Sequence, residues 1–307
     1  MMTPEELEAA MARHRALTNG AVNLNFFADR GGSQDVDAVE RMADRLAPWY
    51  QRFGLAGPLR ELPDAPDFFD MARLEQVLAI APRVVSFHFG LPPPEMIARL
   101  KAARILLMST ATTVAEARAL QAAGVDAIIA QGYEAGGHRG SHAISAAGDG
   151  VGTLALVPQV VDAVSVPVIA AGGIADGRGI AAAFALGASG VQLGSGFLRA
   201  REAATDPARR DLLAVARDDD TMVTPAISGR SARAKRSRLA EELAAEGTDL
   251  PRFPTLYRMT GPLLDAGNDE ASFHLYGQAA ALAREAPAAE IVAALVAETA
   301  EVFARLR

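Results

Sequence analysis

"VIAAGGIADGRGIAAAFALGASGVQLGSGFL", residues 168–198, predicts a strand, a helix and a second strand in that order. Residues 166–173 and 190–196 are apolar runs, and the alanine-rich segment 176–187 between them has the length of a helix. Gly187 ends this segment, as a C-cap glycine commonly does. Because two strands joined by a crossover helix run parallel, the stretch predicts a parallel sheet covered by helices.

Similar apolar runs recur along the chain, separated by amphipathic segments rich in Ala, Leu, Arg and Glu. The candidate strands are residues 21–28, 84–90, 105–110, 126–132, 166–173, 190–196 and, with a weaker pattern, 221–228. Their apolarity is continuous rather than alternating, which is typical of strands covered on both faces. A helix is expected before the first of them, because Thr3 and Glu6 can form a capping box around Pro4.

Polar residues and glycines follow nearly every candidate strand, which favours a TIM (β/α)8-type barrel over a doubly wound sheet. A barrel places its site in the loops after all strands, whereas an open sheet concentrates it at one switch point. Seven candidate strands leave this barrel one strand short of eight. Helices are predicted after it at 232–247, 272–285 and 287–306. We therefore expect a barrel domain over 1–230 and a helical extension over 231–307 that packs on it.

The composition narrows the class of protein. The 307 residues carry 30 basic and 37 acidic side chains, a net charge of -7, which gives no general attraction to nucleic acid or to anionic membranes. There is no cysteine, so disulfides, thiolate metal sites and cysteine nucleophiles are excluded. With no membrane-length apolar run and no signal-peptide pattern, we expect a cytoplasmic protein.

Glycines follow both strands of the opening stretch, at Gly172 and Gly173 and again at Gly194 and Gly196. Such glycines let backbone N–H groups converge on an anion, and the next helix N-terminus adds its positive dipole end. The alternative is that they only make tight turns. Because two successive loops share the pattern, we favour a phosphate-bearing ligand.

Three amides, Asn23, Gln131 and Gln192, are predicted at strand ends, where they could bind the edge of a planar cofactor. Taken singly, each could equally satisfy nearby backbone groups.

Glu134 has two possible roles, either orienting His138 or pairing with Arg139. The basic run 230–238 is interpreted as a solvated or phosphate-facing helix. No nucleic-acid partner is expected from it.

His138 lies in the glycine-rich segment "QGYEAGGHRGSH", residues 131–142. Its glycine and arginine neighbours do not suit a core histidine. A metal site shared with His142 is disfavoured, because Gly140 argues against the helix that would place both on one face, and no metal is expected. We favour a general base, since an unperturbed histidine has a pKa of about 6.5. His88 is interpreted as buried and structural.

Six segments together resemble the nitronate monooxygenases, once called 2-nitropropane dioxygenases. They are "VNLNFFA", "SFHFGLP", "STATTVAEA", "QGYEAGGHRG", "AAGGIADGRGIAAAFALGASGVQLGSGFL" and "TPAISGRSAR". The resemblance implies a barrel that binds FMN without a covalent link and oxidises an alkyl nitronate with O2 to a carbonyl compound and nitrite. The FMN-contacting positions it implies are Asn23, Gln131, Gly136, Gly173, Gln192, Leu193, Gly194 and Ser195. It makes His138 the base that takes the α-proton from a neutral nitroalkane.

Family members begin with a strand of the type "PIIQAPMAG", a helix and a "GGLG" turn, all upstream of the helix at Thr3. We therefore expect the missing strand to be the first, through a start site assigned too far downstream or a truncated copy. Two alternatives stay open: an NAD(P)H-dependent flavin reductase of quinones or enoyl thioesters, and a flavin-binding remnant without activity. A homo-oligomer is a further possibility.

Overall fold

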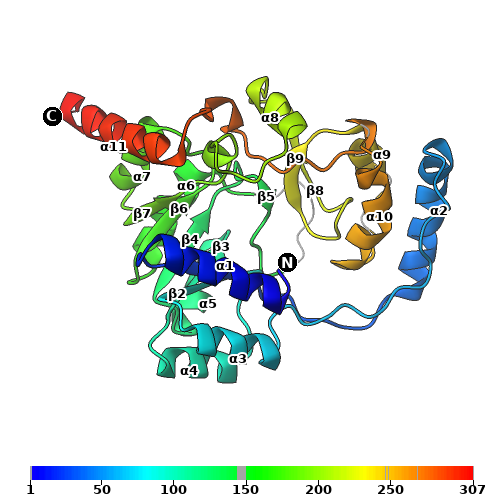
Figure 1. Ribbon diagram of the computed structural model, residues 1–307, viewed down its shortest axis with the longest axis horizontal. Helices are drawn as coiled ribbons and strands as arrows, with labels where there is room; N and C mark the ends of the chain where they lie inside the picture. The colour runs from blue at the N-terminus through cyan, green and yellow to red at the C-terminus, as the bar shows by residue number, and fades with distance from the viewer. Residues whose placement is uncertain (1, 144–149, 246, 248, 268, 307) are drawn as a thin grey trace.

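The computed structural model describes residues 2–143, 150–245, 247, 249–267 and 269–306, which form an α/β fold around a curled parallel sheet (Figure 1). Six strands make up this sheet, and each pairs in parallel with its neighbours. In spatial order they are β1 (Asn23–Phe27), β2 (Val84–His88), β3 (Leu106–Ala111), β4 (Ala127–Gln131), β6 (Val168–Ala171) and β7 (Gly190–Gln192).

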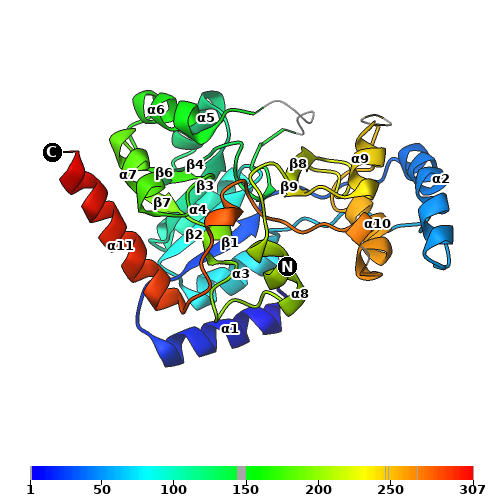
Figure 2. The same ribbon diagram turned by 90° about the horizontal axis from the view of Figure 1, so that it is seen from above.

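Helices alternate with these strands. The helices are α1 (Pro4–Leu17), α2 (Val36–Arg52), α3 (Met71–Ile80), α4 (Pro94–Ala102), α5 (Val114–Ala122), α6 (Thr153–Ala163), α7 (Gly177–Ala185), α8 (Pro207–Ala214), α9 (Arg238–Ala245), α10 (Thr255–Asp265) and α11 (Ala288–Arg305), with 3-10 turns at Ser195–Phe197, Asp269–Ala271 and Ala280–Leu282. Of these, α3 to α7 lie against the parallel sheet, whereas α2, α9 and α10 form a separate group away from it (Figures 1 and 2). The expected capping box is present: Glu6 N donates to the Thr3 hydroxyl and Thr3 N donates to the Glu6 carboxylate.

The two faces of the sheet differ in what they contact. In β1, Leu24 and Phe26 are buried in the apolar cluster that also contains Leu7 of α1 and Leu74 of α3. Asn25 and its same-face neighbours in β1 are more exposed and point toward the concave side. The core therefore lies between sheet and helices, and the concave side is left for polar side chains and a pocket.

The seventh predicted strand is not part of this sheet. Residues 221–224 form β8 (Thr221–Thr224), which pairs antiparallel with β9 (Ala232–Lys235), and β9 pairs antiparallel with β5 (Gly137–His138). The connection 225–231 is too short for the crossover that a parallel partner requires. The parallel sheet thus has six strands where the sequence predicted seven, and β1 and β7 are its edges among the described residues.

Two predicted helices are also wrong in part. Residues 232–235 form β9, where Arg233 is buried and its guanidinium donates to the Tyr133 carbonyl and the Thr221 hydroxyl. The prediction of a solvated helix over 230–238 is therefore wrong, because α9 begins only at Arg238. Residues 272–277 form no helix, since their backbone groups bond mostly to β9 and to distant loops, and only a turn and the 3-10 helix Ala280–Leu282 follow. The helix expected over 287–306 is confirmed as α11.

The C-terminal region contacts the rest of the chain at two opposite ends (Figures 1 and 2). At one end α9 and α10 share an apolar cluster with α2, through buried residues such as Leu46, Leu243 and Met259. At the other end α11 packs along α7. The domain boundary at residue 230 stays a prediction; the β8–β9 hairpin spans it. Within the described residues, no helix is long and apolar enough to cross a bilayer.

The contact between α7 and α11 depends on Gly177. A Cβ built on Gly177 would overlap the Cβ of Glu298, and the backbone N of Thr299 would lie only 2.5 Å away. The Glu298 carboxylate in turn accepts from the Gly177 N–H. The absence of a side chain therefore lets the two helices approach and lets α11 cap α7.

Gly177→Ala should separate these helices and lower the free energy of unfolding by about 1–3 kcal/mol, as overpacking typically does. Gly261→Ala in α10 is the matched control, because a Cβ there meets no atom within 4 Å. Chemical denaturation of both variants measures the effect. An equal stability of G177A and G261A would contradict the proposed role of Gly177.

Candidate functional site

A pocket of about 280 Å3 lies at the carboxyl ends of the parallel strands. It receives Phe27 from the end of β1, His88 from β2 and Gln131 from β4, because the carboxyl ends of parallel strands meet at one rim of the sheet. The predicted site residues that line it are Gln131, Gly136, His138, Gly173, Gln192, Gly194 and Ser195. Asn23 and Leu193 do not line it.

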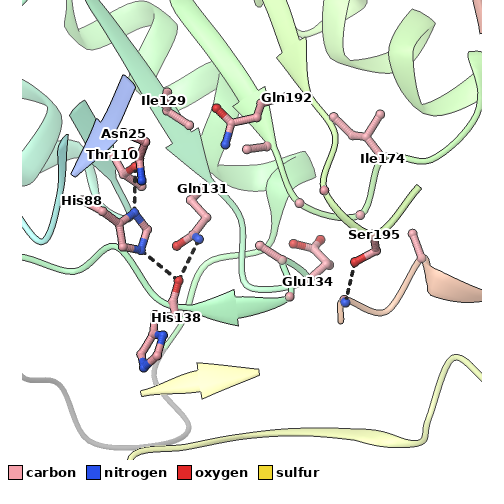
Figure 3. A pocket seen from close by; sticks show the side chains of 18 of the residues that line it. Asn25, His88, Thr110, Ile129, Gln131, Glu134, His138, Ile174, Gln192 and Ser195 are labelled. Carbon is pink, nitrogen blue, oxygen red and sulfur yellow. Dashed lines mark hydrogen bonds between the residues drawn. The ribbon is translucent and has the colours of Figure 1, made fainter. Parts of the chain in front are cut away.

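The three predicted amides have different surroundings. Asn23 is the first residue of β1, at the opposite end of the strand from the pocket, and donates to the Ser86 hydroxyl; Asn25 lines the pocket instead. Gln131 uses both ends of its amide, donating to the His138 carbonyl at 3.1 Å and accepting from Gly140 N at 2.8 Å. The exposed Gln192 bonds to no described side chain, so its amide is open to a ligand in the pocket (Figure 3).

The glycine loops leave backbone donors open at the rim. Gly172 and Gly173 have φ values of 100° and 70°, which glycine adopts without strain. Among the described residues, the N–H groups of Gly173, Gly194 and Ser195 have no acceptor. Unpaired backbone donors from two neighbouring loops suit a phosphate or another anion.

The helix that follows the first of these loops does not add to this anion site. At the N-terminus of α7, Asp176 accepts from the N–H groups of Arg178 and Gly179, and Glu298 accepts from that of Gly177. Two carboxylates already occupy the positive end of the helix dipole. The expected contribution of this helix terminus is therefore wrong, and an anion at this rim would have to be bound by the loop amides alone.

The backbone of His138 is held from two directions. Figure 3 shows its carbonyl, and not its ring, turned toward His88 and Gln131. His88 Nε2 lies 3.0 Å from this oxygen and Gln131 Nε2 lies 3.1 Å from it. These contacts hold the glycine-rich loop in place through its backbone and leave the ring outside this set of bonds.

The ring of His138 lies among aromatic side chains. Phe27, Phe89 and Phe253 present edges or faces to it at centroid distances of 6.1, 5.9 and 5.4 Å. Its Nε2 is 3.0 Å from the Ser228 hydroxyl. Burial, followed by the charges of His88 and Arg230, lowers the pKa of His138 to about 4. The near-neutral pKa expected from the sequence is thus corrected, and the ring is uncharged at neutral pH.

His88 lines the pocket and is also structural, as expected. Because a carbonyl only accepts, the His138 oxygen fixes the proton of His88 on Nε2. Nδ1 then accepts from the Thr110 hydroxyl at 3.1 Å. Burial lowers the pKa of His88 to about 4, so both ring nitrogens of an uncharged imidazole are occupied.

Glu134 and Arg139 do not play the parts considered for them. The Glu134 carboxylate accepts from the backbone N and hydroxyl of Thr153, at the start of α6. Arg139 is buried and donates to the Gly132 carbonyl at 2.7 Å, and burial lowers its pKa. Both expected pairings of Glu134 are therefore wrong. His142 donates from Nε2 to the Thr110 carbonyl rather than sharing a ligand with His138.

Gly277 and Ala279 line the pocket and were missed from the sequence. Gly277 N donates to the Ser195 hydroxyl at 2.8 Å, which joins the C-terminal segment to the loop after β7. A Cβ on Gly277 would lie 2.6 Å from the Glu134 carbonyl and 2.8 Å from Gly136 N. The one sequence signal for this close contact between backbones was a glycine within a segment whose pattern resembles a helix.

The two half-buried histidines of the pocket predict a loss of stability in acid. Each has a pKa of about 4 in the folded chain and about 6.5 when unfolded, so the unfolded state binds more protons between these values. The stability is at its maximum above the unfolded pKa; it falls progressively as the pH drops from the unfolded toward the folded pKa, and the loss, complete below the folded pKa, is up to roughly 3 kcal/mol per histidine. Thermal unfolding at about pH 7 and about pH 5 should show this loss.

His88→Gln keeps a donor toward the His138 carbonyl and removes one of these titrations. Its unfolding midpoint should therefore change less between the two pH values than that of the parent chain. The same pH dependence in both proteins would mean that His88 does not cause the loss.

Comparison with known proteins places the chain in a family. The family model described as nitronate monooxygenase matches residues 1–298. The nitronate monooxygenase of Pseudomonas aeruginosa is 41% identical over 300 residues, covering 96% of this chain and 86% of that protein. That of Paraburkholderia phytofirmans is 43% identical, covering 95% and 82%.

Solved structures agree with the sequence relatives. Nitroalkane oxidase from Streptomyces ansochromogenes superposes with a TM-score of 0.91 at 38% identity, covering 99% of this chain and 88% of that one. FabK from Thermotoga maritima is more distant, with a TM-score of 0.73 at 29% identity over 100% and 84% of the two chains. The chain belongs to the nitronate monooxygenase family.

Proposed function

We propose that this chain is an FMN-dependent monooxygenase that oxidises alkyl nitronates with O2 to carbonyl compounds and nitrite. The proposal is carried by one observation: a single pocket combines unpaired backbone donors for a phosphate with an uncharged histidine for the substrate. A phosphate site alone would suit many ligands, and a buried histidine alone is common in protein cores. Their placement on one rim supports a cofactor and a proton acceptor that work together.

The residues at the rim fit the phosphate of FMN. The open N–H groups of Gly173, Gly194 and Ser195 would bind it, and Gln192 would donate to the flavin ring or accept from it. Gly136 and Gln131 would form the wall beside the ring, with Asn25 in the place considered for Asn23. Leu193 would contribute through its backbone. Bound FMN would supply the redox chemistry, taking an electron from the substrate and delivering electrons to O2.

His138 would act on the substrate. With an uncharged ring at neutral pH it can accept the α-proton of a neutral nitroalkane, which converts that compound to its nitronate. A nitronate supplied as such has already lost this proton. Phe27, Phe89 and Phe253 surround the ring and would keep water from it, and Phe27, which lines the pocket, would give the alkyl part an apolar wall.

Purified chain loaded with FMN should produce nitrite from an alkyl nitronate in the presence of O2. His138→Ala should retain the flavin, because the loop is held through the His138 carbonyl rather than its ring. Its rate with a neutral nitroalkane should fall by about 100-fold or more, the usual contribution of a general base. Flavin absorbance and nitrite release are the measurements.

Three outcomes would overturn the proposal. A chain that takes up no FMN would exclude the cofactor, and flavin binding without nitrite from any nitronate would leave a binding protein. Anaerobic bleaching of the flavin by NAD(P)H, again without nitrite, would replace the monooxygenase by a flavin reductase.

Gly194→Ala tests the phosphate site separately. A Cβ there meets no protein atom within 4 Å, so the unloaded fold should keep its unfolding midpoint. The added methyl group would enter the space beside the open N–H groups, and FMN affinity should fall by about tenfold. Gly261→Ala, also without contacts, is the control. Titration of flavin fluorescence measures both, and unchanged affinity in G194A would place the phosphate elsewhere.

A further inference from the structure

We propose that Ser228 fixes the His138 ring as the tautomer protonated on Nε2, so that Nδ1 is the atom that takes the proton from substrate. This inference rests on the proposed function of His138 as the base. Ser228 touches neither cofactor nor substrate in this scheme and acts as a positioning residue through the histidine.

The direction of the hydrogen bonds follows from the partners of Ser228. Its hydroxyl lies 2.9 Å from the Arg230 carbonyl, which can only accept, so the hydroxyl proton points there. The Arg230 N–H approaches the same oxygen at 3.4 Å as a donor. Toward His138 Nε2, at 3.0 Å, the Ser228 oxygen therefore offers a lone pair, and Nε2 must carry the proton.

Ser228 has little freedom to reverse this arrangement. Its side chain is 0% exposed, so no bulk water competes for the hydroxyl. The carbonyl it bonds to belongs to Arg230, whose guanidinium forms a buried ion pair with Asp29 at 2.9 Å. The same guanidinium lies over the Phe89 ring at 4.2 Å. The loop that carries Ser228 is thus held by contacts independent of the histidine.

An uncharged imidazole has one proton, so a proton on Nε2 leaves the lone pair on Nδ1. Among the described residues, Nδ1 of His138 has no hydrogen-bond partner, while the residue itself lines the pocket. His88, the other histidine in the lining, has both nitrogens occupied by the His138 carbonyl and Thr110. His138 Nδ1 is therefore the one imidazole lone pair of these two that is open to substrate.

The reaction step is then defined at atomic level. The α-C–H bond of a neutral nitroalkane breaks, its electron pair remains on the substrate as the nitronate, and the proton forms an N–H bond at Nδ1. The resulting imidazolium still donates from Nε2 to Ser228, and its new N–H faces the anion that it has just produced. The aromatic walls offer no other acceptor for Nε2, so loss of the Ser228 hydroxyl would remove the preference for this tautomer.

Nitrogen NMR of chain labelled with 15N-histidine tests the tautomer directly, without any activity. In the unloaded protein at about pH 7, His138 should show a protonated Nε2 and an unprotonated Nδ1, with its signals assigned by their loss in His138→Ala. In Ser228→Ala the signals should move toward the other tautomer or toward an average. A parent spectrum with the proton on Nδ1, or an unchanged pattern in S228A, would overturn the inference.

Thr260→Val is the matched control, because Thr260 is equally buried and its hydroxyl also donates into this loop, to the Ile227 carbonyl at 2.8 Å. It removes a buried hydroxyl without touching the histidine, so the His138 pattern should stay as in the parent. A shift in T260V as large as that in S228A would show a merely structural effect. If a variant fails to fold, the spectrum of the parent chain still shows which ring nitrogen of His138 carries the proton.

Kinetics provide the second measurement. S228A should lower kcat/KM for a neutral nitroalkane by about tenfold and change the rate with preformed nitronate by less than about threefold, since only the first needs the proton transfer. T260V should change neither by more than about threefold. Equal losses with both substrates in S228A would contradict the assigned role. If the chain makes no nitrite at all, the proposed function fails while the NMR result still decides the tautomer.

Discussion

The backbones of Gly136 and Gly277 cross so closely that neither residue can carry a side chain, and the pocket depends on this contact. On one side of the crossing is the loop after β4, which presents His138. On the other is the C-terminal segment, whose Gly277 N–H reaches Ser195 and whose Gln278 N–H reaches the Glu134 carbonyl. A parallel sheet alone would bring the loops to one rim, but this crossing fixes the distance between them.

Much of the fold could be predicted because its signals are local. The six strands of the parallel sheet, the capping box at Thr3 and the helix that ends before Gly187 follow from residues within a few positions of one another. The partner of β8 could not be predicted in this way, since the short connection to β9 favours an antiparallel hairpin that apolarity does not reveal. Residues 272–277 resemble a helix in sequence, yet most of their hydrogen bonds are with distant segments.

In the site, too, local features could be predicted from the sequence and long-range contacts could not. Glycines after two successive strands were sufficient to predict open backbone donors at the rim, because that property belongs to the loops themselves. The chemical state of His138 could not be predicted, since its pKa is lowered by burial, here among aromatic side chains from four separate segments, and then by His88 and Arg230. For Glu134, sequence proximity suggested His138 or Arg139, whereas the fold brings Thr153 closer.

The Gly136–Gly277 crossing also has a consequence for synthesis on the ribosome. The two glycines are separated by about 140 residues of chain, so the first emerges long before the second can meet it. Until then the rim lacks Gly277 and Ala279, and Ser195 lacks its partner. A cofactor that bound to the unfinished rim would contact only part of its site. If the chain binds a cofactor as proposed, the complete set of contacts would be available to it only after Gly277 has reached the rim.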